Sequence, residues 1–418
     1  MTSKRAMSKQ LSVFFRRYPI QFWLLIFGQL ICMTGSGFIW PFIALYIRDS
    51  LDISLSAVSA ILTLRAGATL LSSFFIGPIT DRAGRKNILV ISLFFGALSF
   101  FLLDFAKSMV VFAVLMAGWG ATQPLYRIST EAMIADIVPS EQRMSAYSLL
   151  RISMNVGVAL GPVLGGVLVA ISYSITFYIA ATCLLLVTIY SLIFIRETLT
   201  PDLITQKTKE ESRHELSDIL KDKHFMLFCL GILIVYTMSS QVFVLLTTYL
   251  KENFGISENQ SGFIMAVNAV MIITLQFFIA RSIQRFNPLR MMTLGALFYV
   301  IGTSSNAIGS QVWHFVISMA IVTSGELVLA PTSTTFTANY APPEKRGRYI
   351  SMVGLANGVG YGMGPVFGAF FNDHISPQAI WYGSGIIGIS AVIIFASLIR
   401  RYIPDKWAFK KKFSASNG

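Results

Sequence analysis

A single acidic residue, Glu326, lies in the apolar stretch VTSGELVLAPTSTTF, which runs from Val322 to Phe336. No lysine or arginine lies within ten residues of it on either side. The positions three, four and seven residues away share its face if the stretch is helical, and they carry no cation. Burial favours the uncharged form of a carboxyl group, so Glu326 is suited to take up and release a proton. The alternative is an acid that stays protonated and bonds to a neighbouring hydroxyl.

Further ionisable residues lie inside apolar stretches, where a charge is costly and therefore informative. Arg127 and Glu131 are four residues apart, so their side chains share one helix face. They either form an ion pair with a structural role or take part in a proton relay. Arg65 either pairs with Glu326 or another acid, or it binds an anionic substrate. Arg151 either stabilises Glu131 or joins a charged cluster at the helix ends.

That charged cluster is predicted around the turn GPITDRAGRKN. Its glycines permit a close helix approach and a tight turn. We expect Asp136 to bind the cluster and hold one conformation of the protein. The corresponding position in an internal repeat described below, 203 residues later, is Asn339, which is uncharged. The residues assigned to this conformational switch are Gly77, Asp81, Arg82, Gly84, Arg85, Lys86 and Asp136.

The elements that position these residues are predicted to be membrane-spanning helices. Hydrophobic residues make up 54% of the 418-residue chain and charged residues 13%, which is about half the charged share of a soluble domain. Lipid offers no hydrogen-bond partners to backbone N–H and C=O groups, so long apolar runs are expected to form helices, which bond these groups internally. Twelve runs are long enough to span a bilayer: 20–46, 55–77, 87–106, 109–135, 145–171, 173–195, 225–250, 258–281, 289–309, 312–338, 349–371 and 378–400.

The orientation follows from the distribution of lysine and arginine. If the N-terminus is cytoplasmic, 27 of these residues lie in or beside the inner segments and three lie in outer loops. This asymmetry predicts that both chain ends are cytoplasmic. The net charge of +13 then serves topology and contacts with anionic lipid headgroups, so no nucleic-acid partner is needed to explain it.

The chain contains an internal repeat. The segment from Val138 aligns without a gap with the segment from Ala341, at an offset of 203 residues. At the same offset Glu326 corresponds to Gln123, a neutral residue of similar shape. We therefore predict an N-terminal six-helix bundle (1–195), a cytoplasmic linker (196–224), and a C-terminal six-helix bundle with a basic tail (225–418).

These features together resemble the major facilitator superfamily. The turn from Gly77 is similar to the family's Gly-x-x-x-Asp-Arg-x-Gly-Arg-Lys loop, and the stretch around Glu326 resembles span ten of multidrug efflux members. A run in the fifth span resembles the family's antiporter motif, although small residues four apart also serve as a packing seam. The motif residues are Gly157, Gly161, Pro162, Gly165 and Gly166. The resemblance implies twelve helices in two pseudo-symmetric bundles and places the chain in the twelve-span drug:proton antiporter group.

The expected function is proton-coupled export of lipophilic, cationic or neutral small molecules by alternating access. Glu326, Glu131 and Arg127 are assigned to proton coupling. The predicted substrate cavity is lined by Arg65, Gln123, Tyr126, Trp40, Phe38, Tyr236, Phe243 and Arg151. No cofactor is expected, because the proton gradient supplies the energy, and the expected state is a monomer in the cytoplasmic membrane of a bacterium.

Alternatives in other classes are export of a specific metabolite such as a sugar or an organic anion, with Arg65 as its anchor, and lipid flipping. A non-transporting sensor would need an extramembrane domain, which the chain does not offer. An enzyme is not expected, because the sequence has no HExxH, GxSxG or phosphate-binding loop motif and its four histidines are scattered.

Overall fold

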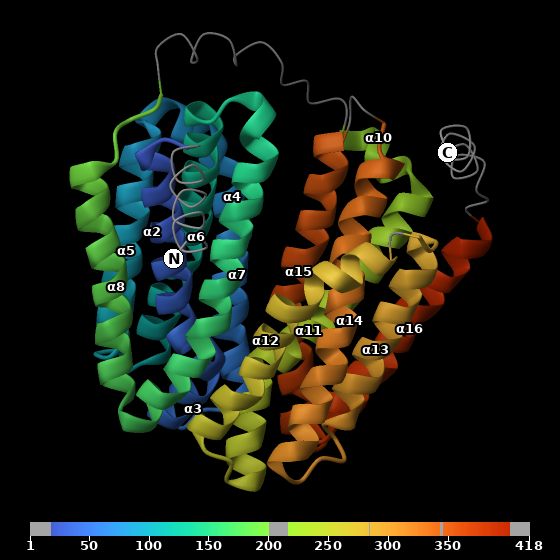
Figure 1. Cartoon of the computed structure of the whole chain (residues 1–418). Helices are drawn as coiled ribbons and strands as arrows, with labels where there is room; N and C mark the ends of the chain where they lie inside the picture. The colour runs from blue at the N-terminus through green and yellow to red at the C-terminus, as the bar shows by residue number, and fades with distance from the viewer. Residues whose placement is uncertain (1–17, 200–215, 284, 343–345, 402–418) are drawn as a thin grey trace, which may run out of the picture.

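The computed structural model describes residues 18–199, 216–283, 285–342 and 346–401, and these residues are almost entirely helical (Figure 1). The all-helical fold predicted from the sequence is confirmed. The first half contains α2 (Ile20–Ile39), the 3₁₀ turn η1 (Trp40–Phe42), α3 (Ile43–Leu51), α4 (Leu55–Ala83), α5 (Arg85–Leu103), α6 (Met109–Ile137), α7 (Ser140–Ile171) and α8 (Tyr173–Phe194). The second half contains α10 (Leu216–Lys221), α11 (Lys223–Phe254), α12 (Glu258–Ile283), α13 (Pro288–Ser305), α14 (Val312–Tyr340), α15 (Arg346–His374) and α16 (Ala379–Arg401).

The helix boundaries repeat at the offset seen in the sequence. The first residues of α2 and α11 are 203 positions apart, and the same holds for α4 with α12, α5 with α13, and α6 with α14. Equivalent side chains in the two halves therefore occupy equivalent places on equivalent helices. The proposed domain limits stay a prediction, and linker residues 200–215 lie outside the described residues.

Ten helices among the described residues are long and apolar enough to cross a membrane. They correspond to ten of the twelve predicted runs, the first being α2, η1 and α3 taken together. α13 and α15 occupy the other two predicted places but do not meet the same hydropathy criterion. Twelve spans and cytoplasmic chain ends therefore remain predictions, and both chain ends lie outside the described part of the structure.

The first span is interrupted near its middle. Pro41 has no backbone N–H and cannot continue the α-helical hydrogen bonding, so the chain forms the 3₁₀ turn Trp40–Phe42 between α2 and α3. The carbonyl of Pro41 accepts a hydrogen bond from the Thr247 hydroxyl on α11. This interruption places Trp40 at the contact between the two halves.

The two groups of helices meet at one end and spread apart at the other (Figure 1). The end where α3 lies, called here the closed end, carries contacts between the halves. Arg48 pairs with Glu252 at 2.8 Å, and the Ser56 backbone N–H donates to Asp373 at 2.8 Å. The end where α10 lies is called the open end. The direct contacts between the halves are made mainly by α7 with α12 and by α4 with α15.

The glycines of α7 allow close helix packing on two sides. A Cβ atom on Gly161 would lie 2.6 Å from the Cα of Gly37 on α2, so these backbones approach as closely as two glycines permit. Gly157 and Gly165 pack against α2 in the same way. A Cβ atom on Gly166 would instead lie 2.9 Å from the Glu258 carbonyl on α12, across the contact between the halves. The motif is thus a packing seam within the first half and between the halves.

Replacing Gly166 with alanine is expected to open the closed end, because the added methyl group forces α7 and α12 apart by a few tenths of an ångström. Spin labels at the exposed positions Ser50 and Ile375 would report a larger share of long distances. Gly67→Ala is the matched control, since a Cβ atom there meets nothing within 4 Å. An unchanged distance distribution in Gly166→Ala would contradict this role of the glycine.

Candidate functional site

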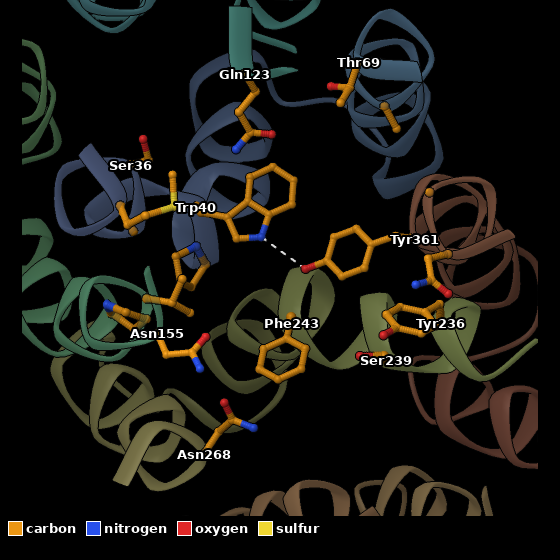
Figure 2. A pocket seen from close by; sticks show the side chains of 18 of the residues that line it. Ser36, Trp40, Thr69, Gln123, Asn155, Tyr236, Ser239, Phe243, Asn268 and Tyr361 are labelled. Atoms are coloured by element: carbon orange, nitrogen blue, oxygen red, sulfur yellow. Dashed lines mark hydrogen bonds between the residues drawn. The ribbon is translucent and has the colours of Figure 1, made fainter. Parts of the chain in front are cut away.

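A cavity of about 640 Å³ lies between the two halves and is lined by side chains from both (Figure 2). Trp40, Gln123 and Asn155 face it from the first half, and Tyr236 and Asn268 face it from the second. Most of the lining is apolar or aromatic, with a few polar groups, which is the usual character of a small-molecule site. Within the described residues, the ionisable acidic and basic side chains of the lining are Arg65, Arg127 and Glu326.

Glu326 belongs to the wall formed by α12 and α14. Gly325 lets α14 approach the Gly295 carbonyl of α13, and the next residue, Glu326, turns toward the cavity and α12. Asn268 of α12 donates a hydrogen bond of 2.8 Å to its Oε2 and also contacts the Thr323 hydroxyl at 3.1 Å. No cation among the described residues forms an ion pair with Glu326. Its hydrogen-bond partner is therefore a neutral amide.

Three tyrosines lie near the same carboxyl group. Tyr236, Tyr299 and Tyr361 lie close enough to Glu326 to interact with it electrostatically. A negative charge on Glu326 would thus lie at the cavity wall, near tyrosine side chains.

Arg65 belongs to the opposite wall, formed by α4, α6 and η1. Its guanidinium carbon lies 4.2 Å from the ring centre of Trp40 and 4.1 Å from that of Trp119, so the cation contacts two indole rings. Its Nη2 atom contacts Oε1 of Gln123 at 3.4 Å. Gly120 makes this packing possible, because a Cβ atom there would lie 2.3 Å from the Arg65 carbonyl oxygen. Trp40 also donates to the Tyr361 hydroxyl of α15 at 3.4 Å (Figure 2).

The structure brings six of the predicted cavity or coupling residues into the lining together with Glu326, namely Arg65, Gln123, Trp40, Tyr236, Phe243 and Arg127. Three predicted cavity residues, Phe38, Tyr126 and Arg151, and the predicted coupling residue Glu131 are absent from the lining as described. Phe38 and Tyr126 are buried within the first half, where Phe38 packs against Gly165. Arg151 is exposed on α7.

Arg127 and Glu131 do not form the ion pair that their spacing suggested. No such pair within 4 Å joins them in the described residues, and both side chains are exposed. Arg127 lines the cavity, whereas the backbone carbonyl of Glu131 accepts a hydrogen bond from Tyr147 at 3.0 Å. A helical spacing of four permits a contact but does not require it.

The turn between α4 and α5 forms part of a network at the open end. Arg85 is buried and pairs with Asp136 at the end of α6, and Asp136 also accepts a hydrogen bond of 2.7 Å from Thr198. Gly84 has φ = 90°, a conformation that favours glycine. Lys86 donates to the Leu192 carbonyl at 2.8 Å. Gly77, Asp81 and Arg82 lie within α4, but their side chains lie outside the described part of the structure.

Sequence reasoning missed Glu197 in this network. Its two carboxylate oxygens accept the backbone N–H groups of Arg85 and Lys86 at 3.1 and 3.0 Å, at the N-terminus of α5. A Cβ atom on Gly84 would lie 2.6 Å from the same carboxylate, so the turn and the acid fit together. An acidic residue directly after the sixth span was the available signal.

The cavity residues that were missed include Trp119, Asn155, Asn268 and Tyr361. Asn268 had a usable signal, because it is a polar residue within an apolar span. The aromatic residues had none, since aromatic side chains are common throughout the chain. Within the described residues, no group of three or more His, Cys, Asp or Glu side chains is arranged to hold a metal ion.

Comparison with known proteins places the chain among transporters. The model of the Major Facilitator Superfamily matches residues 25–249 and 227–417. The chain is 25% identical to the multidrug resistance protein MdtH of Enterobacter sp. (strain 638), over 94% of this chain and 95% of that protein. It is 24% identical to a Na⁺, Li⁺, K⁺/H⁺ antiporter of Planococcus maritimus, over 88% and 92%. It is also similar to a variant of the nucleoside transporter NupG, with a TM-score of 0.77, 13% identity, and coverage of 90% of this chain and 99% of that one.

Proposed function

Because the chain belongs to the Major Facilitator Superfamily and is a transporter, not an enzyme, we propose that it exports lipophilic small molecules in exchange for protons. The proposal includes twelve spans, cytoplasmic chain ends and a monomer in the cytoplasmic membrane of a bacterium. The names of two relatives, a multidrug resistance protein and a cation/proton antiporter, support this direction.

The observation that carries the proposal is the setting of Glu326. It is a carboxyl group in the cavity between the two halves, it is hydrogen-bonded to a neutral amide, and no cation of the described residues pairs with it. A carboxyl group of this kind can change its protonation state when the cavity changes sides, because water access changes its solvation. In a polytopic membrane protein an acid in such a place is functional by default.

The shape of the molecule supports the alternating access that we propose. The halves touch at the closed end and spread apart at the open end, which the proposed topology places in the cytoplasm (Figure 1). Rocking the halves about the cavity would open the other end and expose the same side chains to the outside. One proton moving inward supplies about 2.3 kcal/mol per 100 mV of membrane potential, so one proton per cycle can drive export.

The proposal is tested in inverted membrane vesicles that contain the protein and across which a pH gradient is imposed. A fluorescent lipophilic dye is expected to accumulate in the lumen only while the gradient lasts, and a protonophore should release it. Vesicles without the protein are the control. A fluorescent phospholipid in the same vesicles tests lipid flipping, and its translocation without dye accumulation would favour that alternative. Failure to move the dye under any gradient would contradict proton-coupled export.

A further inference from the structure

In both halves a side-chain hydrogen bond joins the same two equivalent positions, but the residues at these positions differ in charge. Arg65 and Asn268 are 203 residues apart, as are Gln123 and Glu326. Arg65 of α4 contacts Gln123 of α6, and Asn268 of α12 contacts Glu326 of α14. One half therefore holds a cation against an amide, and the other half holds an amide against an acid.

These two contacts lie on different sides of the cavity. Gln123 and Asn268, the amide partners of the two pairs, face each other from opposite sides of the pocket (Figure 2). Arg65 and Glu326 both line the pocket, but no ion pair joins them in the described residues. The protein thus keeps a positive and a negative site apart, although direct pairing would neutralise both.

Arg65 lacks a counter-ion although it is almost fully buried, with 8% of its surface exposed. None of the ion pairs formed among the described residues includes it. Its Nε atom is buried without a hydrogen-bond partner, and its contact with Gln123 is long. A buried charge without a partner is unfavourable, so an anionic group supplied by a ligand would be strongly bound.

The indole rings determine how such a group would bind. The ring centres of Trp40 and Trp119 lie 4.2 and 4.1 Å from the guanidinium carbon and 5.8 Å from each other, so the two rings flank the group from adjacent sides and leave its other sides for a ligand. In-plane guanidinium donors match the two oxygens of a carboxylate. Glu326 is the reverse case, because its carboxyl group lines the cavity and no cation of the described residues pairs with it, so it can bind a ligand ammonium group.

We propose that the transported molecule is a zwitterionic amphiphile, whose acidic group binds Arg65 and whose basic group binds Glu326. The inference rests on the proposed function and narrows its substrate class. The ammonium group and a proton compete for Glu326, so substrate entry from the cytoplasm releases the proton there. A proton from outside then displaces the substrate at the outer side. Each cycle returns Glu326 to its starting state and exchanges one proton for one molecule.

The test uses three related fluorescent compounds that share an apolar body. Nα-dansyl-lysine is a zwitterion whose carboxylate and ammonium groups are separated by the lysine side chain, its methyl ester is a cation, and its Nε-acetyl derivative is an anion. In vesicles with a pH gradient, we expect the zwitterion to be transported with an apparent KM about tenfold lower than that of either relative. Equal transport of the anion and the zwitterion would overturn the inference, because Glu326 would then contribute no cation site.

Arg65→Gln should raise the KM for the zwitterion about tenfold and leave the KM for the methyl ester within about twofold, since the ester has no acidic group to lose. Arg65→Lys should restore part of the affinity. Arg281→Gln, which removes an exposed arginine at the end of α12, is the matched control. Thermal unfolding of each variant separates loss of binding from loss of the fold.

Two outcomes are decisive for different reasons. If Arg65→Gln weakens transport of all three compounds equally, Arg65 has a structural role in the cavity and does not bind the acidic group of the substrate. The inference then fails while the proposed function stands. If the folded wild type moves none of the compounds and no dye under a pH gradient, the proposed function itself fails.

Discussion

Glu326→Gln is expected to abolish uphill transport while the protein remains folded and exchanges substrate downhill. Glutamine has almost the same shape as glutamic acid, and its side-chain oxygen can still accept the 2.8 Å hydrogen bond from Asn268. It cannot release a proton, so the exchange loses its driving force. A potential of 100 mV on one proton corresponds to roughly a fiftyfold gradient, and this accumulation should fall to about onefold.

The measurement combines dye accumulation with the proton flux that dye addition triggers, followed by a pH-sensitive fluorophore in the vesicle lumen. Glu131→Gln is the matched comparison, because Glu131 is the other acid assigned to coupling, is exposed, and does not line the cavity in the described residues. Retained gradient-driven transport in Glu326→Gln would remove Glu326 from the coupling mechanism. If only Glu131→Gln loses gradient-driven transport, proton coupling would be assigned to Glu131 on α6 instead.

Asp136→Ala is expected to lower the free energy of unfolding by about 2–3 kcal/mol. Arg85 is 4% exposed, and removing its carboxylate partner leaves a buried cation with weaker contacts, including the Ala132 carbonyl at 3.2 Å. The Thr198 hydroxyl loses its acceptor in the same substitution, which frees the start of the linker. Thermal unfolding in detergent measures the effect.

Asn339→Ala provides the control for this substitution. Asn339 occupies the equivalent position in the second half, is exposed, and is uncharged, so its loss should change the unfolding temperature little. Equal stability of Asp136→Ala and Asn339→Ala would contradict the assignment of Asp136 to a stabilising network. Loss of stability in both would point to a general effect at the helix ends.

The fold could be predicted largely because two independent patterns agree. Long apolar runs predict helices, and the 203-residue repeat predicts that helices recur at equivalent places. The surroundings of Glu326 could be predicted in part, because the sequence places no cation on its helix face. Its amide partner Asn268 could not be predicted, because that contact depends on how α12 and α14 are rotated against each other.

The lining of the cavity was harder to predict for a related reason. Helices that contact lipid on one side and protein on the other are apolar on both, so periodicity does not separate the faces. Phe38 and Tyr126 were therefore assigned to the cavity, although they are buried within the first half. Trp40 reaches the cavity because Pro41 interrupts the helix there, and the sequence WPF contains that information.

Ionic strength should act differently on the two kinds of contact at the closed end. The Arg48–Glu252 pair has side chains that are 27% and 28% exposed, so salt in the medium screens it, with a Debye length of about 8 Å at physiological concentration. The packing of Gly166 against α12 involves no charge and is insensitive to salt. The proposed topology places this end outside the cell. Under the proposed topology and mechanism, we expect external salinity to change how often the transporter opens outward, and we expect the packing at Gly166 to stay unchanged.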